Sequence, residues 1–578
     1  MKSHLSTNHI LSSSISPENF IRLCILSIIV GVLGGLAAAT FTLLLRGLNY
    51  VFHDLIFPAI DIYVFGIHLG WLVLPIFGAA LALLITFKYA PECRGSGIPE
   101  LMYSVTLNRG RIRKRTIPSK LIASALTVTS GGSAGREGPA AHVGGAIGST
   151  LGNLLKLSPF EIRILIAGGV AGAVAGTFNA PLGGAIFGLE VLFHGIGLFS
   201  IIPMFLSSVA GAMINTAIFG DFVDFPVSTE WPWMQADVYI VFIVFGILFG
   251  LLSYLWKTLF LYTSRFYNKY KIDEKYRPLW GALVTGIVLS IFPDYGLTGT
   301  GYVGIYMILQ NQLFPLMMLL LGVLKMITTS QTVASGGSGG LFGPTIFIGA
   351  MFGGFLGSII SVLFPGVPID KNLYVLIGMG ALFAGSTQSP INIVVIIGEM
   401  TRNFSVIPLL MTACACSFIV SWLFFKGTSI YTVKFEQMGI SLKNQSFFML
   451  QNLEVDDAMS YDLLYFDPET PLDVFLEQTN EIDFSIFPIL KHQMLDGIIT
   501  RDHKHSLKEL DEPENIKLKD VMQKEFITIA RYEYIQDAID LMVEKQVNAI
   551  IVLENEDSKK IVGVLTKKDI LKICEMKT

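Results

Sequence analysis

The sequence predicts an all-α polytopic membrane domain with an internal repeat, followed by a soluble α/β domain that is itself a tandem repeat. Only 15% of the 578 residues are charged and 52% are hydrophobic, and the mean hydropathy is +0.60. Ordinary soluble domains carry roughly 25% charged residues. Charges are sparse between residues 20 and 425 and frequent from Glu454 onward. This shift in composition marks the boundary between the two parts.

Two matching glycine-rich stretches predict the repeat in the membrane domain. Residues 130–139 read SGGSAGREGP and residues 335–344 read SGGSGGLFGP, at an offset of 205 (335 − 130). Two more landmarks recur in the same order: Gly95-Ser-Gly97 with Gly299-Thr-Gly301, and the stretch Pro181…Glu190 with Pro390…Glu399. Internal repeats of this kind underlie many transporter folds and are usually inverted in the membrane.

The two glycine-rich stretches also predict the type of site. Each follows one apolar run and precedes another. A glycine-rich turn that leads into a helix leaves backbone N–H groups and the positive end of the helix dipole unpaired, which favours an anion. Broken helices at matching positions in two halves are typical of transport sites. We therefore expect an anion-conducting membrane protein.

The remaining composition excludes several classes. The first apolar segment, Leu23–Leu45, is long enough to span a bilayer, and no basic region with a cleavage site precedes it, so we expect no signal peptide. The five cysteines fit no metal or disulfide spacing. The net charge of −4 gives no indication of a nucleic-acid partner, and we expect none. The basic run Arg109–Arg115 is expected in a cytoplasmic loop.

The domain boundaries follow from these changes. We expect a polar N-terminal segment at 1–19, a transmembrane domain at 20–440 with halves at about 20–220 and 235–440, a linker at 441–450, and soluble units at 451–515 and 516–578. In the last unit, hydrophobic periodicity predicts strands at Phe526–Ala530, Ala549–Leu553 and Ile561–Leu565, and helices at Ile535–Gln546 and Lys567–Met576.

Four ordered motifs resemble the CLC family of chloride channels and chloride/proton exchangers. They are Gly95-Ser-Gly-Ile-Pro99, Gly135-Arg-Glu-Gly-Pro139, Gly340-Leu-Phe-Gly-Pro344, and Tyr431 in Gly427-Thr-Ser-Ile-Tyr431. The resemblance covers about residues 20–440, and the tail resembles a pair of CBS domains. It implies an all-α membrane protein with an inverted internal repeat, followed by a soluble α/β tandem CBS pair. It also implies a homodimer with one chloride pore in each subunit.

The resemblance assigns a central chloride site to two hydroxyls and two backbone amides. Carried over, these are the side chains of Ser96 and Tyr431 and the N–H groups of Leu341 and Phe342. Donors without a full positive charge suit this role, because conduction requires weak binding at several sites. A serine at this position resembles the chloride-selective members of the family.

Glu137 is the candidate gating residue. A carboxylate inside a membrane is costly, and near helix N-termini it would compete with an anion. In the family this glutamate gates the pore, and in exchangers it also carries the proton. The resemblance adds Gly135, Arg136 and Gly138 to the outer anion path.

The residue after Glu190 bears on the choice between two mechanisms. Exchangers commonly place a second, inner proton glutamate there, whereas this chain has Val191, which cannot bind a proton. We therefore expect a passive chloride channel influenced by voltage and pH, with a secondary active chloride/proton antiporter as the alternative. A divalent-cation transporter is disfavoured because the membrane carboxylates are scattered, and no catalytic constellation indicates an enzyme.

The tail carries a candidate nucleotide site. Gly563-Val-Leu-Thr566-Lys-Lys-Asp569 matches the family pattern in which Thr566 and Asp569 contact an adenine nucleotide. In the first unit the matching aspartate, Asp502, comes one position early. A regulatory nucleotide module and a structural module remain open, and no cofactor is required. We expect the inner membrane of a bacterium, with the N-terminus and CBS domains cytoplasmic; an organelle membrane is the alternative.

Overall fold

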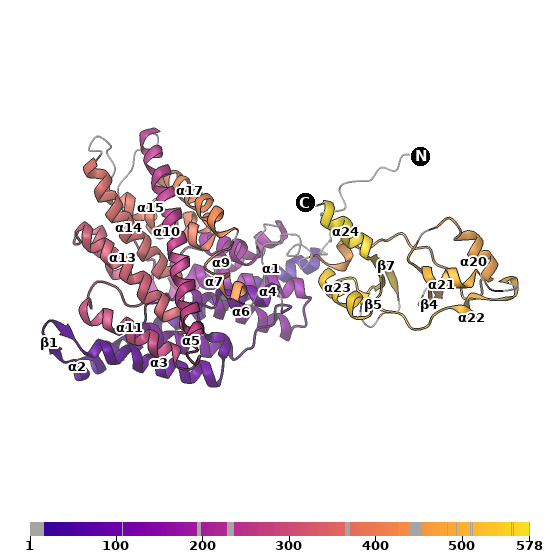
Figure 1. The fold of residues 1–578 in the computed structure, drawn as a ribbon, viewed down its shortest axis with the longest axis horizontal. Helices are drawn as coiled ribbons and strands as arrows, with labels where there is room; N and C mark the ends of the chain where they lie inside the picture. The colour runs from indigo at the N-terminus through magenta and orange to yellow at the C-terminus, as the bar shows by residue number, and fades with distance from the viewer. Residues whose placement is uncertain are drawn as a thin grey trace. The chain divides into compact units, whose positions relative to one another are not determined.

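The computed structural model forms two compact units, one spanning Pro17–Lys443 and one formed mainly by Asn444–Thr578 (Figure 1). The residues that the structure describes are 17–106, 108–193, 198–227, 236–363, 370–426, 428–437, 453–482, 484–492, 494–508, 510, 513–555, 558 and 560–576. The expected linker at 441–450 and Gly427 lie outside them.

The membrane unit is a bundle of helices of unequal length. Among the described residues, 8 helices are long and apolar enough to cross a membrane. The helices of the first half are α1 Pro17–Asn49, η1 Tyr50–Ile56, α2 Phe57–Ile60, α3 Gly70–Lys88, η2 Pro91–Cys93, α4 Ile98–Thr106, α5 Thr116–Thr129, α6 Glu137–Leu154, α7 Pro159–Phe178, α8 Pro181–Phe187, η3 Gly188–Phe193 and α9 Leu198–Phe219. A short hairpin of β1 Tyr63–Val64 and β2 Ile67–His68 precedes α3.

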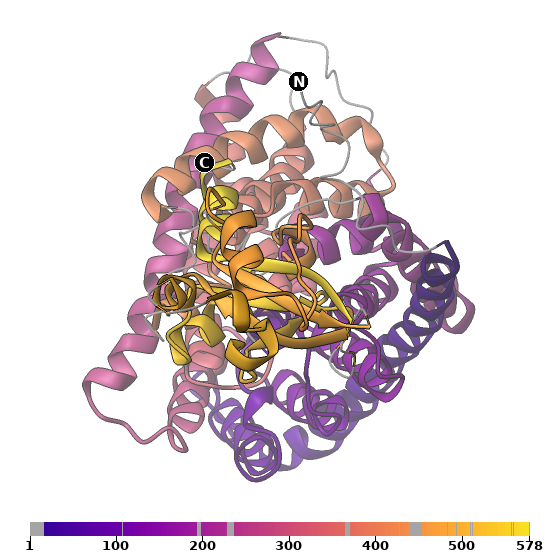
Figure 2. The same cartoon turned by 90° about the vertical axis from the view of Figure 1, so that its right-hand side faces the viewer.

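The second half repeats these elements. Its helices are α10 Ala236–Lys269, α11 Arg277–Ile291, α12 Tyr302–Leu309, α13 Pro315–Thr329, η4 Ser330–Ala334, α14 Phe342–Leu363, α15 Lys371–Thr387, α16 Pro390–Thr401, η5 Phe404–Val406, α17 Ile407–Phe425 and α18 Val433–Gln437. Helices α4 to α9 correspond in order to α12 to α17. In both views the first half (indigo to magenta) and the second half (pink to orange) lie side by side (Figures 1 and 2).

A reciprocal pair of carboxylates shows that the repeat is inverted. Glu399, near the end of α16, accepts hydrogen bonds from the Leu182 and Gly183 amides at the start of α8, at 3.0 and 2.7 Å. Glu190, just beyond α8, accepts from the two equivalent amides of α16 at 3.1 and 2.8 Å. Each carboxylate caps the positive end of the other helix. The two helices therefore run antiparallel, as an inverted repeat requires.

The two glycine-rich stretches meet at the centre of the unit. Gly135 and Gly340 each donate a backbone hydrogen bond to the other's carbonyl, both at 2.7 Å. The hydroxyls of Ser124 and Ser338 hydrogen-bond at 2.8 Å. The hydroxyls at the two repeat-related positions, Thr329 and Ser133, hydrogen-bond at the same distance. The predicted breaks in the two halves thus form one joint structure that holds the N-termini of α6 and α14 together.

Two buried lysines, which belong to none of the sequence motifs, fix the loops around this centre. Lys120 on α5 and Lys325 on α13 are both 0% exposed and stand 205 residues apart (325 − 120). The Lys120 ammonium donates to the carbonyls of Cys93 and Gly95 at 3.0 and 2.7 Å. The Lys325 ammonium donates to the four carbonyls of residues 296–299, at 2.9 to 3.4 Å. Each lysine satisfies carbonyls in the loop that precedes a short helix, α4 for Lys120 and α12 for Lys325.

The C-terminal unit contains two small sheets. Strands β3 Ile486–Lys491 and β4 Met494–Thr500 form an antiparallel pair. Strands β5 Thr528–Ala530, β6 Ala549–Leu553 and β7 Ile561–Thr566 form a sheet in the order β5-β6-β7. The helices are η6 Val455–Asp457, α20 Leu472–Gln478, α21 Arg501–Leu507, η7 Pro513–Asn515, α22 Leu518–Val521, α23 Ile535–Glu544 and α24 Lys567–Met576. The strands and helices predicted for the last unit are confirmed to within a few residues.

The two sheets share one hydrophobic core. Ile486 and Ile498 from the first sheet pack in one cluster with Ile551 and Val564 from the second. The shared cluster joins the two sheets into one folded unit.

One membrane helix is longer than its apolar stretch. The sequence predicts a first span at Leu23–Leu45, whereas α1 begins at Pro17 and the helical path continues through η1 and α2 to Ile60. The chain after Leu45 stays helical because residues 46–57 contain no proline and η1 is again apolar apart from His53 and Asp54.

Candidate anion-transport site

The Glu137 carboxylate lies where two helix N-termini meet. Glu137 is the first residue of α6 and is 3% exposed. Its Oε2 accepts a hydrogen bond from the Gly343 amide in the first turn of α14 at 3.4 Å, and its Oε1 accepts from the Tyr302 hydroxyl at 3.3 Å. A helix N-terminus attracts negative charge. The carboxylate therefore occupies a position that also suits a bound anion.

The glycines around Glu137 leave room for this arrangement. A Cβ on Gly135 would lie 2.2 Å from Glu137 Oε2, and a Cβ on Gly138 would lie 2.6 Å from the carbonyl oxygen of Ser96. Neither contact is sterically allowed. Gly135 lets the carboxylate fold back onto its own loop, and Gly138 lets α6 approach the loop that carries Ser96.

Gly135→Ala is expected to displace the Glu137 carboxylate from the Gly343 amide, because the added methyl group and Oε2 cannot share the same space. Chloride turnover at neutral pH should rise severalfold and depend less on acid, as measured by chloride efflux from proteoliposomes across a pH series. Gly47→Ala is a matched control, since a Cβ at Gly47 meets nothing within 4 Å. Unchanged turnover and pH dependence would show that the carboxylate does not obstruct the anion.

Two of the four predicted chloride-binding residues line one cavity, and the other two, Phe342 and Tyr431, each follow a lining residue in the sequence. Ser96 and Leu341 line a cavity of about 340 Å³, together with Ile430, the residue before Tyr431. Ser96 is 5% and Tyr431 3% exposed. The cavity leads from the surface to the N-terminus of α14, where the first amides have no partner within the helix. The charged residues that line it are Arg94, Arg277 and Lys434 with Glu100 and Glu274.

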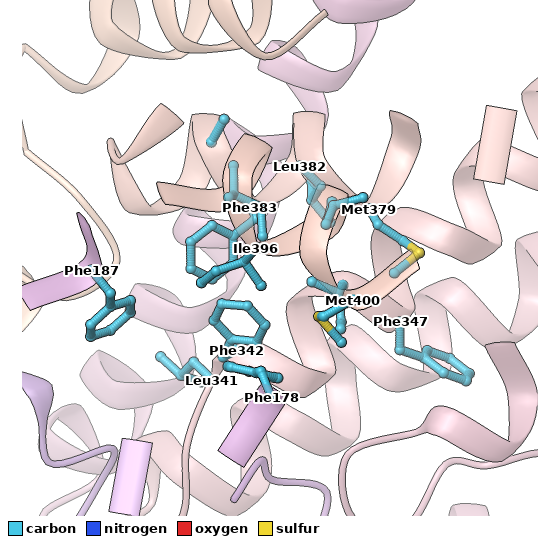
Figure 3. Close-up of a cluster of buried hydrophobic side chains, with 14 of the residues drawn as sticks. Phe178, Phe187, Leu341, Phe342, Phe347, Met379, Leu382, Phe383, Ile396 and Met400 are labelled. Atoms are coloured by element: carbon cyan, nitrogen blue, oxygen red, sulfur yellow. The ribbon is translucent and has the colours of Figure 1, made fainter. Parts of the chain in front are cut away.

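Aromatic packing fixes the start of α14. The Phe342 ring lies 4.6 Å from the Phe178 ring and 4.5 Å from the Phe383 ring, measured between centroids. Figure 3 shows the Phe342 ring between these two neighbours, with Leu341 beside it. This packing holds the backbone amides of α14 in place, which favours an anion site because preorganised donors need not reorganise when the ion arrives.

Arg136 lies beside Glu137 with a buried acid and two tyrosines. One of its amino groups (Nη2) donates to the Thr177 carbonyl at 3.3 Å and lies 3.9 Å from Asp224 Oδ1. The guanidinium also sits 5.7 Å from the centre of the Tyr302 ring. The Tyr306 hydroxyl donates to the backbone carbonyl of Asp224. Asp224 was not predicted from the sequence, because it lies in the loop between α9 and α10 and matches no motif.

The pKa of Asp224 is raised to about 6, chiefly by burial; Arg136 opposes the shift and Glu137 adds to it. Asp224 is thus neutral below about pH 6 and charged above it. When charged, it offsets the attraction of Arg136 for an anion. Asp224→Asn should therefore remove a pH-dependent step near 6 from chloride transport and raise the apparent chloride affinity at pH 7.5 severalfold. Steady-state flux against chloride concentration at several pH values measures both effects, and identical curves would contradict the role.

The inner proton position holds no titratable side chain. Val191 is 3% exposed and packs in the main hydrophobic core. Its neighbour Glu190 is engaged with the amides of α16 and so has a structural role. Within the described ranges, no group of three or more His, Cys, Asp or Glu side chains is placed to hold a metal ion.

In the C-terminal unit, Thr566 and Asp569 form hydrogen bonds with each other. The Thr566 hydroxyl donates to Asp569 Oδ2 at 2.5 Å, and the Asp569 amide donates back to Thr566 Oγ1 at 3.2 Å. This reciprocal capping box starts α24. In the first unit of the C-terminal region, the Thr500 hydroxyl accepts from the His503 amide at 3.4 Å. The aspartate of that unit, Asp502, therefore takes no part in this cap.

A family model described as "Voltage gated chloride channel" matches residues 78–422, more than half of the chain. The chain belongs to the CLC family. A model described as "CBS domain" matches residues 518–575. The H(+)/Cl(-) exchange transporter ClcA of Vibrio cholerae is 29% identical over 448 residues, which cover 76% of this chain and 93% of that protein. The transporter of the same name from Vibrio vulnificus is 31% identical over 419 residues, covering 70% and 87%.

Solved structures agree with this assignment. A slow cyanobacterial Cl−/H+ antiporter is 27% identical, with a TM-score of 0.65 over 73% of this chain and 99% of that chain. A eukaryotic CLC transporter matches 96% of this chain and 99% of its own with a TM-score of 0.63, and at 20% identity this shows the fold alone.

The expectation of a passive channel is wrong. These relatives, and the cyanobacterial structure, are described as proton-coupled exchangers. The expectation rested on Val191, that is, on the absence of a proton-binding side chain at one position. Coupling depends on whether some route brings a proton to Glu137, and a single replaced residue does not close every route.

Proposed function

We propose that this CLC protein is a secondary active exchanger that moves chloride and protons in opposite directions across a membrane. The observation that supports the proposal most is the position of the Glu137 carboxylate, which accepts from the Gly343 amide at the N-terminus of α14. A carboxylate there competes directly with an anion. The relatives described as H+/Cl− exchangers extend over most of the chain.

The exchange follows from this competition. When Glu137 is ionised, its carboxylate holds the anion position and blocks passage. Protonation removes the negative charge and with it the attraction of the helix N-terminus, so the side chain leaves and chloride enters. When chloride moves on, the protonated side chain releases its proton to the other side of the membrane, and the ionised carboxylate returns to the anion position. Chloride on the cavity side of Glu137 is bound by the hydroxyls of Ser96 and Tyr431 and by the amides of Leu341 and Phe342.

The test is proton movement driven by chloride. The assay uses proteoliposomes with a chloride gradient and no initial pH gradient. Valinomycin and potassium are added so that net ion flux can occur, and the external pH is recorded. An exchanger moves protons uphill, and a protonophore abolishes the resulting pH change. Chloride flux without any proton movement would refute the proposal.

We further propose a homodimer with one chloride path in each subunit, in the inner membrane of a bacterium, with the CBS pair cytoplasmic.

Thr566 and Asp569 then form part of an adenine-nucleotide site that regulates transport. Binding of a radiolabelled adenine nucleotide to the purified full chain, and its loss in Asp569→Ala, tests this site. Nucleotide-independent transport with no binding would leave the CBS pair a structural role only.

A further inference from the structure

A second cavity of about 290 Å³ lies beside the 340 Å³ cavity that Ser96 and Leu341 line, and the two cavities share Glu100 and Lys434. Its wall comes from α4, α6, α18 and the loop that carries the basic run. The charged and titratable residues that line it are Glu92, Glu100, Arg111, Arg113, His142 and Lys434. It lies on the side that the basic run predicts to be cytoplasmic.

His142 is the buried member of this lining. It is 1% exposed, and its Nδ1 atom is buried without a hydrogen-bond partner among the described residues. A buried polar nitrogen without a partner costs free energy and calls for an explanation. His142 lies on α6 five residues after Glu137, which corresponds to a rise of about 7.5 Å and a rotation of about 140° along the helix. A proton therefore passes between the two side chains through intervening water and not by a direct hydrogen bond.

The His142 side chain packs against the loop that carries Ser96. A Cβ placed on Gly97 would lie 2.9 Å from His142 Nδ1, so the ring packs directly against the residue that follows Ser96. On the next turn of α6, Gly138 packs against the Ser96 carbonyl. The imidazole therefore lies between the second cavity and the loop that carries Ser96, on the cavity side of Glu137.

The charges around the imidazole come from three elements. Lys120 on α5 and Lys434 on α18 both act on it as cations, and Glu100 on α4 lines the same cavity. Lys120 is held by the carbonyls of Cys93 and Gly95, and Lys434 forms an ion pair with Glu100. The Oε2 atom of Glu100 is buried without a partner among the described residues.

We propose that His142 carries protons between the second cavity and Glu137, in place of the inner glutamate that Val191 replaces. The inference rests on the proposed exchange function. A proton from cavity water binds one ring nitrogen of the neutral imidazole and gives the imidazolium. The proton on the other nitrogen then leaves toward the Glu137 carboxylate, which becomes neutral, and the imidazole returns to its neutral form. One proton moves and no other bond changes.

The test compares His142→Gln and His142→Asn with wild type in proteoliposomes, with chloride and proton fluxes recorded together. Both side chains keep a polar group at the position and neither binds a proton near neutral pH. We expect chloride flux to persist, because Glu137 can still take up and release its proton on the opposite side of the membrane. Proton flux should fall at least about a hundredfold, the scale at which losing a proton-transfer group acts. The proton-to-chloride ratio is the decisive quantity, because a structural defect would lower both fluxes together.

The outcomes separate this inference from the proposed function. If wild type moves no protons, the exchange function fails whatever the variants do, and the inference fails with it. If wild type is coupled and either variant keeps the wild-type proton-to-chloride ratio, His142 is not the carrier although the exchange function stands. If one variant does not assemble, as judged by its elution from a sizing column, the other variant carries the same test.

Discussion

Glu137→Gln is expected to abolish proton transport while chloride still moves. Glutamine keeps the size and polarity of the side chain but cannot bind a proton near neutral pH and carries no negative charge to hold the Gly343 amide. Chloride flux should therefore lose the pH dependence that comes from Glu137 and keep only the step assigned to Asp224. Simultaneous recording of chloride and proton movement in proteoliposomes measures both effects.

The matched control is Glu18→Gln, at the exposed start of α1, which should leave both fluxes unchanged. Proton flux at the wild-type ratio in Glu137→Gln would remove Glu137 from the proton path. Loss of both fluxes in a protein that still elutes as wild type would instead show that the carboxylate is needed for chloride passage itself.

Lys325→Met is expected to lower the stability of the membrane unit more than any of the other proposed substitutions. The ammonium of Lys325 is the shared donor for the four carbonyls of residues 296–299, and methionine keeps the length without any donor. Buried acceptors left unpaired cost about 1–3 kcal/mol each, and relaxation of the loop recovers part of that. We expect a net loss of about 3 kcal/mol and a melting temperature lowered by at least about 5 °C in detergent.

Two lysines provide the controls for this prediction. Lys371→Met, at the exposed start of α15, should not change the melting temperature. Lys120→Met removes the donor of only two carbonyls and should give an intermediate loss. A melting temperature for Lys325→Met equal to that of Lys371→Met would mean that the loop before α12 does not depend on this lysine.

The repeated architecture was predictable because its constraints are local in sequence. Glycines must stand where backbone segments meet, and the matching stretches at 130–139 and 335–344 showed where the two halves break. The same offset of 205 relates Lys120 to Lys325, so a search for charged residues at that spacing would have found the buried lysines. A lysine within an apolar run is itself a signal, since its burial must be compensated.

The inverted arrangement of the halves was predicted only through the family resemblance, and the cluster of Arg136 with Asp224 was not predicted at all. Glu190 and Glu399 are recognisable as repeat partners, but that each caps the other's helix is a property of three-dimensional packing. Asp224 becomes relevant only because its loop folds back against Arg136. His142 stands in a run of small residues on α6, and only the fold places it beside a cavity.

The choice between channel and exchanger was where the sequence misled. Val191 is a true difference from the common exchanger pattern, and the structure leaves it in a closely packed core without a titratable side chain. Coupling, however, is a relation between two fluxes through Glu137. It is set by whether a proton reaches that carboxylate, and different residues on different elements can deliver it.

The central claim, coupled exchange, is tested most directly by driving chloride with protons. Proteoliposomes are prepared with equal chloride on both sides and a pH gradient, the membrane potential is clamped at zero with valinomycin and equal potassium, and internal chloride is followed over time. An exchanger accumulates or expels chloride against its own developing gradient, in the direction opposite to proton flow. A passive chloride path leaves internal chloride unchanged under these conditions, and that result would contradict the account.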